Sequence, residues 1–257
     1  MIRFTRRRSV AGLPTRPILP GLLTTAALAL GLTAGCMVEQ DLTLNDDLSG
    51  QWRLEGRAMP FAGDALDDLA ILGGYDDAGA LYDEALANGR ANLAARPDVG
   101  DAALERTGAH GWTGRVAFAD LRILLGSPES GGMVALESRG NRRTLRLDYN
   151  RESARHLSEL IPLMNEPALS LFNPAETEGI DEESYITGIL GFTFGEENIP
   201  AIRRATVVTD LRLPGPVVAV EGGRQTGTNS VRYEIPFSRF IVPETPVLWT
   251  VTWIDDE

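Results

Sequence analysis

Apolar and polar residues alternate in two neighbouring segments, residues 40–44 and 51–58. Between them stands the run Asn45-Asp46-Asp47-Leu48-Ser49-Gly50, which has the composition of a turn. Because successive side chains of a strand point to opposite faces, a period of two indicates strands with one buried face. We therefore predict a β-hairpin at this point of the chain.

Alanine and leucine recur at helical spacing in residues 64–72 and 80–95, and a proline stops the second run. This spacing predicts two short helices. A third helix is expected over residues 152–163. Asp181 has the side chain of an N-cap for a fourth, which runs to about residue 190, and the two glutamates that follow it suit the positive end of a helix dipole.

The other β signals are short runs, and those after Pro200 are separated by Pro-Gly and Gly-Gly breaks. Strand patterns occur at residues 103–107, 112–119, 132–138, 144–149, 205–213, 217–221, 230–235 and 247–253. Long connections without parallel β-α-β alternation favour an antiparallel sheet with helices on one side. The pattern as a whole predicts an α+β fold, with a mainly antiparallel sheet and several helices packed on one side.

The first 35 residues differ in composition from the rest of the chain. Five arginines and no acidic residue accompany a mostly apolar stretch at residues 18–32, an arrangement typical of a cleaved signal peptide. A membrane anchor is the alternative, but a spanning helix needs about 20 apolar residues and Pro20-Gly21 interrupts this shorter stretch. Export in the unfolded state is expected. A twin-arginine route, suggested by Arg6-Arg7-Arg8, is the alternative, although Ser9 stands where a large apolar residue belongs.

The only cysteine of the chain, Cys36, directly follows Leu32-Thr33-Ala34-Gly35, which is the arrangement of a bacterial lipoprotein precursor. Ordinary cleavage after Ala34-Gly35, with an incidental cysteine, is the alternative. A lone thiol in an oxidising compartment is, however, a liability unless its sulfur is used. A thioether from Cys36 to diacylglycerol, followed by cleavage before Cys36 and acylation of the new amino group with a chain such as palmitate, supplies that use. Two or more acyl chains give stable attachment.

We therefore predict a lipid-anchored protein on the cell membrane or the outer membrane, with its domain outside the cytoplasm, in the periplasm or at the cell exterior. Removal of residues 1–35 takes five arginines and no acid from a 257-residue chain of formal charge −12, which leaves 222 residues with a charge of −17. Such a surface disfavours phosphate backbones, so no nucleic-acid partner is expected. The remaining length fits one large domain or two small ones.

Three segments resemble the LppM-type envelope lipoproteins. Residues 42–51 are similar to that family's first hairpin with its Ser-Gly exit, and Gly111-Trp112-Thr113-Gly114 with the following Asp120-Leu121 is similar to its Gly-aromatic-x-Gly strand and turn. The third segment runs from Leu211-Arg212-Leu213-Pro214-Gly215 through Gly222-Gly223-Arg224 to Val231-Arg232-Tyr233-Glu234-Ile235-Pro236. The order of the segments agrees across most of the chain after Cys36.

The resemblance implies a single extracytoplasmic α+β domain over residues 36–257, with a role in the envelope and lipid contact. It implies no catalytic residue. Two differences stand out. The family can carry a transmembrane segment after the domain, whereas the sequence of this chain ends soon after Trp253. The family also has only a short connection where this chain has a helical insertion at about residues 150–204. Features special to this protein are therefore expected in that insertion.

Motifs for chemistry are few. Gly222 to Gly227 has the glycine spacing of a phosphate loop, but Thr228 replaces the lysine, so we predict a hairpin turn. His110 and His156 are the only histidines and no free thiol accompanies them, so neither a metal site nor a cofactor is expected. Trp249 and Trp253 share one face of a strand, where core packing is the main interpretation and a carbohydrate or lipid platform the alternative.

These observations predict a non-enzymatic envelope lipoprotein that binds a lipid or amphiphile, or a protein partner, at the membrane surface. An extracytoplasmic hydrolase is the alternative, for which the acidic pairs at residues 46–47, 67–68, 76–77 and 182–183 are candidates. It requires two carboxyls that converge in a cleft with raised pKa values. Lipid binding in turn requires the apolar side chains between residues 160 and 194 to line an open groove, among them Leu169, Leu171, Phe172, Phe192 and Phe194.

Overall fold

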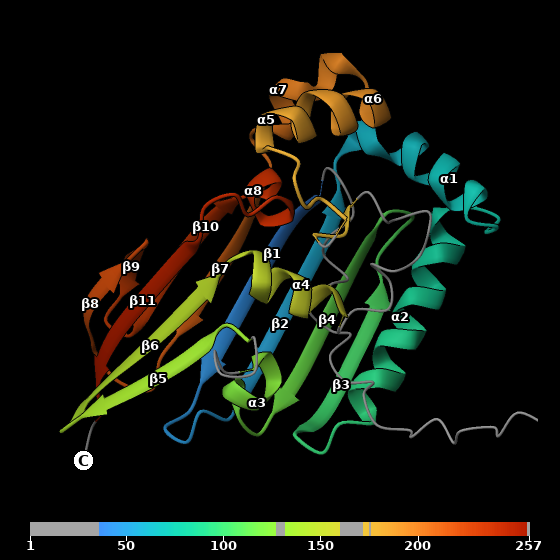
Figure 1. Ribbon diagram of the computed structural model, residues 1–257. Helices are drawn as coiled ribbons and strands as arrows, with labels where there is room; N and C mark the ends of the chain where they lie inside the picture. The colour runs from blue at the N-terminus through green and yellow to red at the C-terminus, as the bar shows by residue number, and fades with distance from the viewer. Residues whose placement is uncertain (1–35, 127–131, 160–171, 175, 256–257) are drawn as a thin grey trace, which may run out of the picture.

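The computed structural model of the protein describes residues 36–126, 132–159, 172–174 and 176–255. Its strands form two sheets, and helices gather at one end and along one side (Figure 1). This arrangement confirms the predicted α+β class.

The larger sheet has seven strands in the order β3-β4-β2-β1-β7-β10-β9. Neighbouring strands are antiparallel except β1 and β7, which run parallel and bring Val38 beside Val207. The predicted hairpin is β1 and β2, so the first strand begins at Cys36 itself. In chain order the strands are β1 (Cys36–Leu44), β2 (Gly50–Ala58), β3 (Val99–Arg106), β4 (Gly111–Phe118), β7 (Thr206–Arg212), β9 (Gly223–Gly227) and β10 (Ser230–Pro236).

The smaller sheet is antiparallel throughout, in the order β5-β6-β11-β8. Its strands are β5 (Val134–Arg139), β6 (Arg142–Tyr149), β8 (Val217–Glu221) and β11 (Val247–Ile254). It lies over the β1, β7 and β10 half of the larger sheet (Figure 1). Tyr233 of β10 stacks on Trp249 of β11 with ring centroids 4.9 Å apart, so the two sheets share a core.

Gly222 carries the chain from β8 in the smaller sheet to β9 in the larger one. Its φ of +73° lies in the left-handed region, and a Cβ at this position would lie 2.5 Å from the carbonyl oxygen of Leu248. Both facts require glycine here. The predicted turn over Gly222 to Gly227 is wrong, however, because residues 223–227 form β9 and the chain turns only afterwards, at Thr228 and Asn229.

Helices occupy the positions that the alanine and leucine spacing predicts. The first two are α1 (Gly63–Leu72), preceded by the short η1 (Pro60–Ala62), and α2 (Ala78–Ala94), which packs against β3. Shorter helices follow later in the chain: α3 (Leu121–Leu125), α4 (Arg151–Glu159) and α8 (Phe237–Ile241). The end of the predicted helix over residues 152–163 lies outside the described residues.

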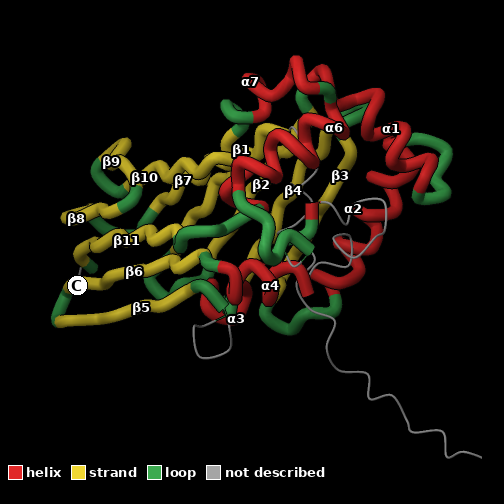
Figure 2. Tube along the Cα trace, turned by 45° about the horizontal axis from the view of Figure 1, so that its top comes forward, coloured by secondary structure: helices red, strands yellow, loops and turns green. Residues whose placement is uncertain are grey.

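A cluster of short helices follows Asp181, whose side chain caps it by accepting a hydrogen bond from the backbone N–H of Ser184 at 2.8 Å. The predicted N-cap is therefore confirmed. The cluster comprises α5 (Glu182–Ser184), the π-helix η5 (Tyr185–Leu190), α6 (Gly191–Phe194), η6 (Glu196–Asn198) and α7 (Ile199–Ile202). It lies at the same end of the molecule as α1 in both views (Figures 1 and 2).

Candidate functional site

The seven-stranded sheet has one buried face and one open face. Along β1, Val38, Leu42 and Leu44 are buried, whereas Glu39 and Asp41 between them point the other way. Strands β2, β7 and β10 repeat the alternation, as with Trp52 and Leu54 in β2. Because the period of a strand is two, each of these four strands contributes apolar side chains to the core and polar ones to the opposite surface.

Charged residues from six strands form a row across the middle of this open face. Asp41 on β1 is the register partner of Arg53 on one side and of Asp210 on the other. Arg115 and Arg232 extend the row outward from these residues, and Arg224 lies beyond Arg232. Two aspartates therefore lie at the centre with two arginines on each flank, an order that only the strand pairing creates.

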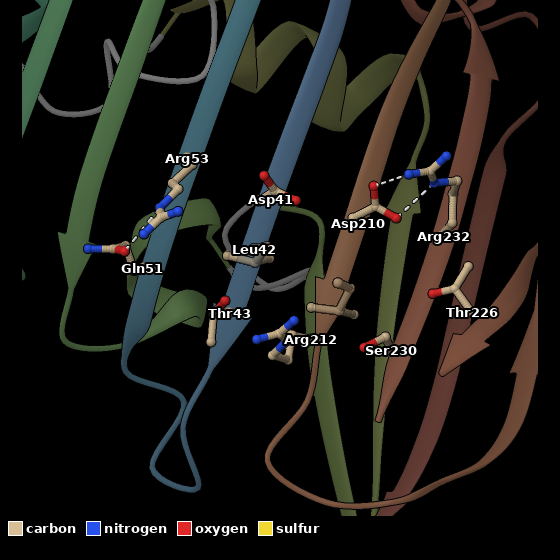
Figure 3. Close-up of a pocket in the computed structure, with 11 residues that line it drawn as sticks. Asp41, Leu42, Thr43, Gln51, Arg53, Asp210, Arg212, Thr226, Ser230 and Arg232 are labelled. Carbon is tan, nitrogen blue, oxygen red and sulfur yellow. Dashed lines mark hydrogen bonds and ion pairs between the residues drawn. The ribbon is translucent and has the colours of Figure 1, made fainter. Parts of the chain in front are cut away.

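A groove of about 510 Å³ lies over this row at β1, β7 and β10 (Figure 3). Three arginines and two aspartates line it together with hydroxyl and amide side chains; its lining is Asp41, Leu42, Thr43, Gln51, Arg53, Asp210, Leu211, Arg212, Thr226, Ser230 and Arg232. A second hollow of about 250 Å³ adjoins it on the same face and shares Asp41 and Arg53. The groove is thus a polar, mixed-charge surface.

The arginines of the groove differ in how much of their hydrogen-bonding capacity is used. Arg232 donates to both carboxylate oxygens of Asp210, at 2.8 and 2.5 Å. These hydrogen bonds raise the pKa of Arg232 above its ordinary value, and the nearby charges of Glu234 and Glu39 add to the effect. This pair is therefore a fixed, satisfied part of the groove wall.

The other two arginines keep most of their donors available. Arg53 makes one long hydrogen bond, from Nε to Gln51 Oε1 at 3.4 Å, and Figure 3 shows its guanidinium directed toward that side chain. Arg212, the register partner of Thr43, makes no hydrogen bond or ion pair with any described residue. Since a guanidinium presents five N–H donors, the groove offers unused donors on both sides of Thr43.

The predicted attachment residue, Cys36, is the first residue of β1. Its backbone pairs with Ala58 at the end of β2. The sheet therefore begins at the position where the lipid is predicted, with no connecting segment between them. Of the helices that the structure describes, none has the length and apolar character of a membrane span.

The apolar stretch between residues 160 and 194 is only partly described, and Leu169 and Leu171 lie outside the described residues. Phe172 and Phe194 are buried and stack on each other with ring centroids 6.2 Å apart. Phe192, in contrast, is 90% exposed. The described aromatic residues of this stretch thus divide between the core and the surface.

Each acidic pair singled out in the sequence has a structural role for at least one member. Asp67 and Asp77 accept hydrogen bonds from the backbone N–H groups of Ala78 and Ala80, and Asp47 accepts one from Ser49. Glu183 forms an ion pair with Arg203. The hydrogen bonds from Ser49 and Arg203 lower the pKa values of Asp47 and Glu183, the opposite of the shift that a carboxyl general acid requires.

The other residues singled out in the sequence are the two histidines and the tryptophans Trp249 and Trp253. His110 lies 3.5 Å from Asp67, and the side chain of His156 is outside the described residues. No group of three or more potential metal ligands occurs within the described residues. Trp253 is buried and Trp249 packs on Tyr233, so the core interpretation of these tryptophans is confirmed and the platform alternative is wrong.

Sequence reasoning missed the groove. Its residues are 41–53 and 210–232, two segments far apart in the chain, and the charge row appears only when β1 pairs with β7. The polar positions of the alternating strands were a usable signal for the open face. They do not show which residues are neighbours on that face.

Comparison with known proteins adds little. No protein family matches the sequence, and no curated protein matches it. Among solved structures, the folded domain of LppM from Mycobacterium tuberculosis, determined by NMR, is similar with a TM-score of 0.39 and 11% sequence identity, over 87% of this chain and 92% of that chain. This degree of similarity places the chain in no family, so the resemblance to LppM-type lipoproteins stays a prediction.

Proposed function

We propose that this protein is a lipid-anchored, non-enzymatic binding protein of a bacterial envelope. Cys36 attaches it to the outer surface of a membrane, and the open polar face of the seven-stranded sheet binds a partner protein through acidic groups of that partner. The observation that carries the proposal is the groove at β1, β7 and β10, in which the guanidinium groups of Arg53 and Arg212 keep unused donors.

The chemistry of the groove favours a polar partner over an acyl chain. Thr43, Thr226 and Ser230 line it beside the arginines. A carboxylate accepts a bidentate hydrogen bond from a guanidinium, and such pairs are stronger and more directional than bonds between neutral groups. Phe172 and Phe194, which an open acyl-chain groove requires at its wall, are buried against each other instead.

The distance from the attachment point supports the same choice. The lining residues Asp41 and Thr43 follow Cys36 by five and seven residues along one strand. At a rise of about 3.3 Å per residue they lie roughly 17 and 23 Å from it. The headgroup layer on each side of a bilayer is only about 5–8 Å thick. With β1 upright on the membrane, the groove lies above the headgroups, within reach of another envelope protein.

The hydrolase alternative has one observation in its favour, since Asp41 and Asp210 are register partners in the groove. Against it, both oxygens of Asp210 accept hydrogen bonds from Arg232, so this carboxylate already has a structural partner in the groove wall. Turnover of esters, glycosides or peptides that is abolished by Asp41→Asn would establish the alternative and overturn the non-enzymatic proposal.

The attachment is tested by cell fractionation of the full chain and a Cys36→Ser variant. The original protein is expected in the membrane fraction, with a diacylglycerol-modified N-terminal peptide in its mass spectrum, and the variant in the soluble fraction. A variant that stays fully with the membrane contradicts the anchor.

The binding face is tested in intact cells with a photocrosslinking residue at Thr226, inside the groove. A discrete crosslinked product with one partner is expected, and Arg212→Glu combined with Arg53→Glu should abolish it. The matched control is Arg142→Glu, which changes an exposed arginine of the smaller sheet. If the two groove substitutions leave the crosslink unchanged, the partner does not bind through these arginines.

A further inference from the structure

Three large apolar side chains are exposed at one end of the molecule. Ile71 and Leu72, at the end of α1, are 57% and 82% exposed, and Phe192 on α6 is 90% exposed. Both helices lie at the same end in the two views (Figures 1 and 2). Single exposed apolar residues are normal on a protein surface, but here three of the six large apolar side chains that are exposed among the described residues belong to two helices at the same end.

The local structure of each helix places these side chains on the outside. In α1, Gly63, Leu66 and Ala70 form the buried stripe at spacings of three and four, and Ile71 and Leu72 lie off this stripe. Leu72 is the last residue of the helix, and Gly73 caps it. Ile71 and Leu72 are therefore exposed because of their positions on α1, and they contribute nothing to its buried stripe.

In the second helix, the π-helical turn η5 changes the periodicity just before α6. Tyr185, Ile186, Leu190 and Phe194 are buried, and Phe192 points to the solvent between the last two of them. Single π-helical turns inside helices are rare and frequent at functional sites. Thr187 and Gly188, which precede Phe192 by five and four residues, are also exposed and carry no charge.

The attachment point lies at the same end. Cys36 pairs with Ala58, the last residue of β2, and only Met59 separates that strand from η1 and α1. The ring of Phe61 in η1 contacts the ring of Phe194 in α6, with centroids 6.2 Å apart. The start of the sheet, the start of α1 and α6 are therefore neighbours, and α1 extends about 15 Å from there to Leu72.

We propose that this end of the domain is a membrane-docking surface, in which Leu72 and Phe192, with Ile71, insert into the lipid interface beside the anchor. The inference rests on the proposed attachment at Cys36. The occupant is the bilayer because the attachment point lies at the end of the sheet where α1 and α6 begin, so the tether holds these side chains at the membrane and makes docking an intramolecular step.

The charges around the surface define the type of membrane contact. Asp64 and Asp68 are exposed on α1, and Glu196 and Glu197 follow α6, whereas of the two exposed arginines after α7, Arg203 is paired with Glu183 and Arg204 alone adds a positive charge. These carboxylates repel anionic headgroups, so docking relies on apolar insertion into zwitterionic lipid rather than on charge attraction. It should therefore withstand high salt and weaken as anionic lipid is added.

Docking at two points fixes the orientation of the domain as well as its location. A tether at Cys36 alone allows the sheet to tilt in any direction, whereas contacts through α1 and α6 leave a single preferred tilt. The groove then keeps a constant height and direction above the membrane, which lowers the orientational cost of binding another membrane protein.

The experiment uses the lipidated protein in vesicles of phosphatidylcholine. With Cys36 converted to a thioether, a new cysteine at residue 192 or 72 is the single labelling site for a polarity-sensitive dye. Ile123→Cys is the matched control, because Ile123 is also an exposed apolar residue, 60% exposed on α3 at the opposite end of the molecule (Figure 1). Labels at 192 and 72 should shift to shorter emission wavelengths and be quenched by brominated lipid, whereas the label at 123 should show neither effect.

Each outcome separates docking from attachment. Dyes at 192 and 72 that remain unquenched in vesicle-bound protein overturn the docking surface while the anchor stands. Labelling of the unsubstituted protein at Cys36, together with loss of vesicle binding, overturns the anchor instead. A spectral shift that appears without bromine quenching and grows with protein density identifies a second copy of the chain as the occupant and also overturns the proposal.

Discussion

The two faces of the seven-stranded sheet consist of alternate residues of the same strands, yet they have opposite physical roles. On β4, Trp112 and Val116 are buried in the core, whereas Arg115 between them forms an exposed ion pair with Asp101. On the inner face, shape and apolar area determine whether the chain folds. On the open face, we expect most substitutions to change stability little, which leaves its charge order available for recognition.

The largest expected loss of folding stability is on the inner face, for a substitution of Trp112. The indole ring covers Gly56 so closely that a Cβ there would lie 2.2 Å from Nε1. Removing this ring in Trp112→Ala should lower the free energy of unfolding by about 4 kcal/mol, through lost burial and an unfilled cavity. Denaturant titration measures the loss.

The control is on the same strand but on the other face. Arg115→Ala removes an exposed ion pair and should cost less than about 1 kcal/mol. Similar losses for Trp112→Ala and Arg115→Ala would show that the two faces do not differ in the way that the burial pattern indicates.

A smaller loss of stability is expected for a buried pair of charges in the turn between α2 and β3. Arg96 donates to both oxygens of Asp98, at 3.0 and 2.6 Å, and to the carbonyl oxygen of Ile123 at 2.9 Å, and both side chains are buried. Asp98→Ala leaves the guanidinium buried without its carboxylate and should cost about 3 kcal/mol in thermal or denaturant unfolding.

A double variant of the pair tests whether the loss of stability comes from the unpaired charge. Replacing both partners, as in Arg96→Met with Asp98→Leu, removes the unpaired charge and should recover most of the loss. A double variant as unstable as Asp98→Ala would indicate that the geometry of the pair, rather than the uncompensated charge, determines the cost.

On the open face, the equivalent pair of Arg232 and Asp210 should matter far less for folding. Its hydrogen bonds are equally short, at 2.8 and 2.5 Å, but both side chains are about one third exposed. Solvent screening limits such pairs to about 1 kcal/mol or less. Asp210→Ala should therefore change the unfolding midpoint only slightly, and a loss comparable to that of Asp98→Ala would contradict the contrast between the two pairs.

The sequence predicted the elements well where the local pattern determines them. The alternation in residues 40–44 and 51–58 became β1 and β2, and Asp181 caps its helix as expected. Strand β9 escaped prediction because its residues are all exposed at a sheet edge, so no apolar period marks it. The exposure of Phe192 also escaped, because the π-helical turn before it shifts the periodicity from which faces are inferred.

The candidate site could not be predicted from the sequence for a different reason. Asp41 and Arg53 are hairpin partners and follow from local pattern, but Asp210 and Arg212 join them only through the parallel pairing of β1 with β7. No local signal specifies which distant strand lies beside β1. The existence of an open, polar face could be predicted from the alternation. The order of the charges on that face could not.

The smallest expected effect on folding is that of Arg212→Glu, which makes it the sharpest test of the comparison. Because Arg212 is exposed and bonds no described residue, reversing its charge should change the free energy of unfolding by no more than about 0.5 kcal/mol. The same variant, with Arg53→Glu, is expected to abolish the crosslink from Thr226.

A substitution at Arg212 should thus impair binding with little loss of stability. At Trp112 the two effects cannot be separated, because its substitution is expected to destabilise the whole domain. Denaturant titration of Arg212→Glu beside Arg142→Glu decides the matter, because both reverse an exposed arginine and only the first lies in the groove. A loss above about 1 kcal/mol for Arg212→Glu alone would mean that Arg212 stabilises the sheet. The loss of the crosslink in Arg212→Glu would then result from impaired folding rather than from impaired recognition. It would no longer support the open face as a binding surface.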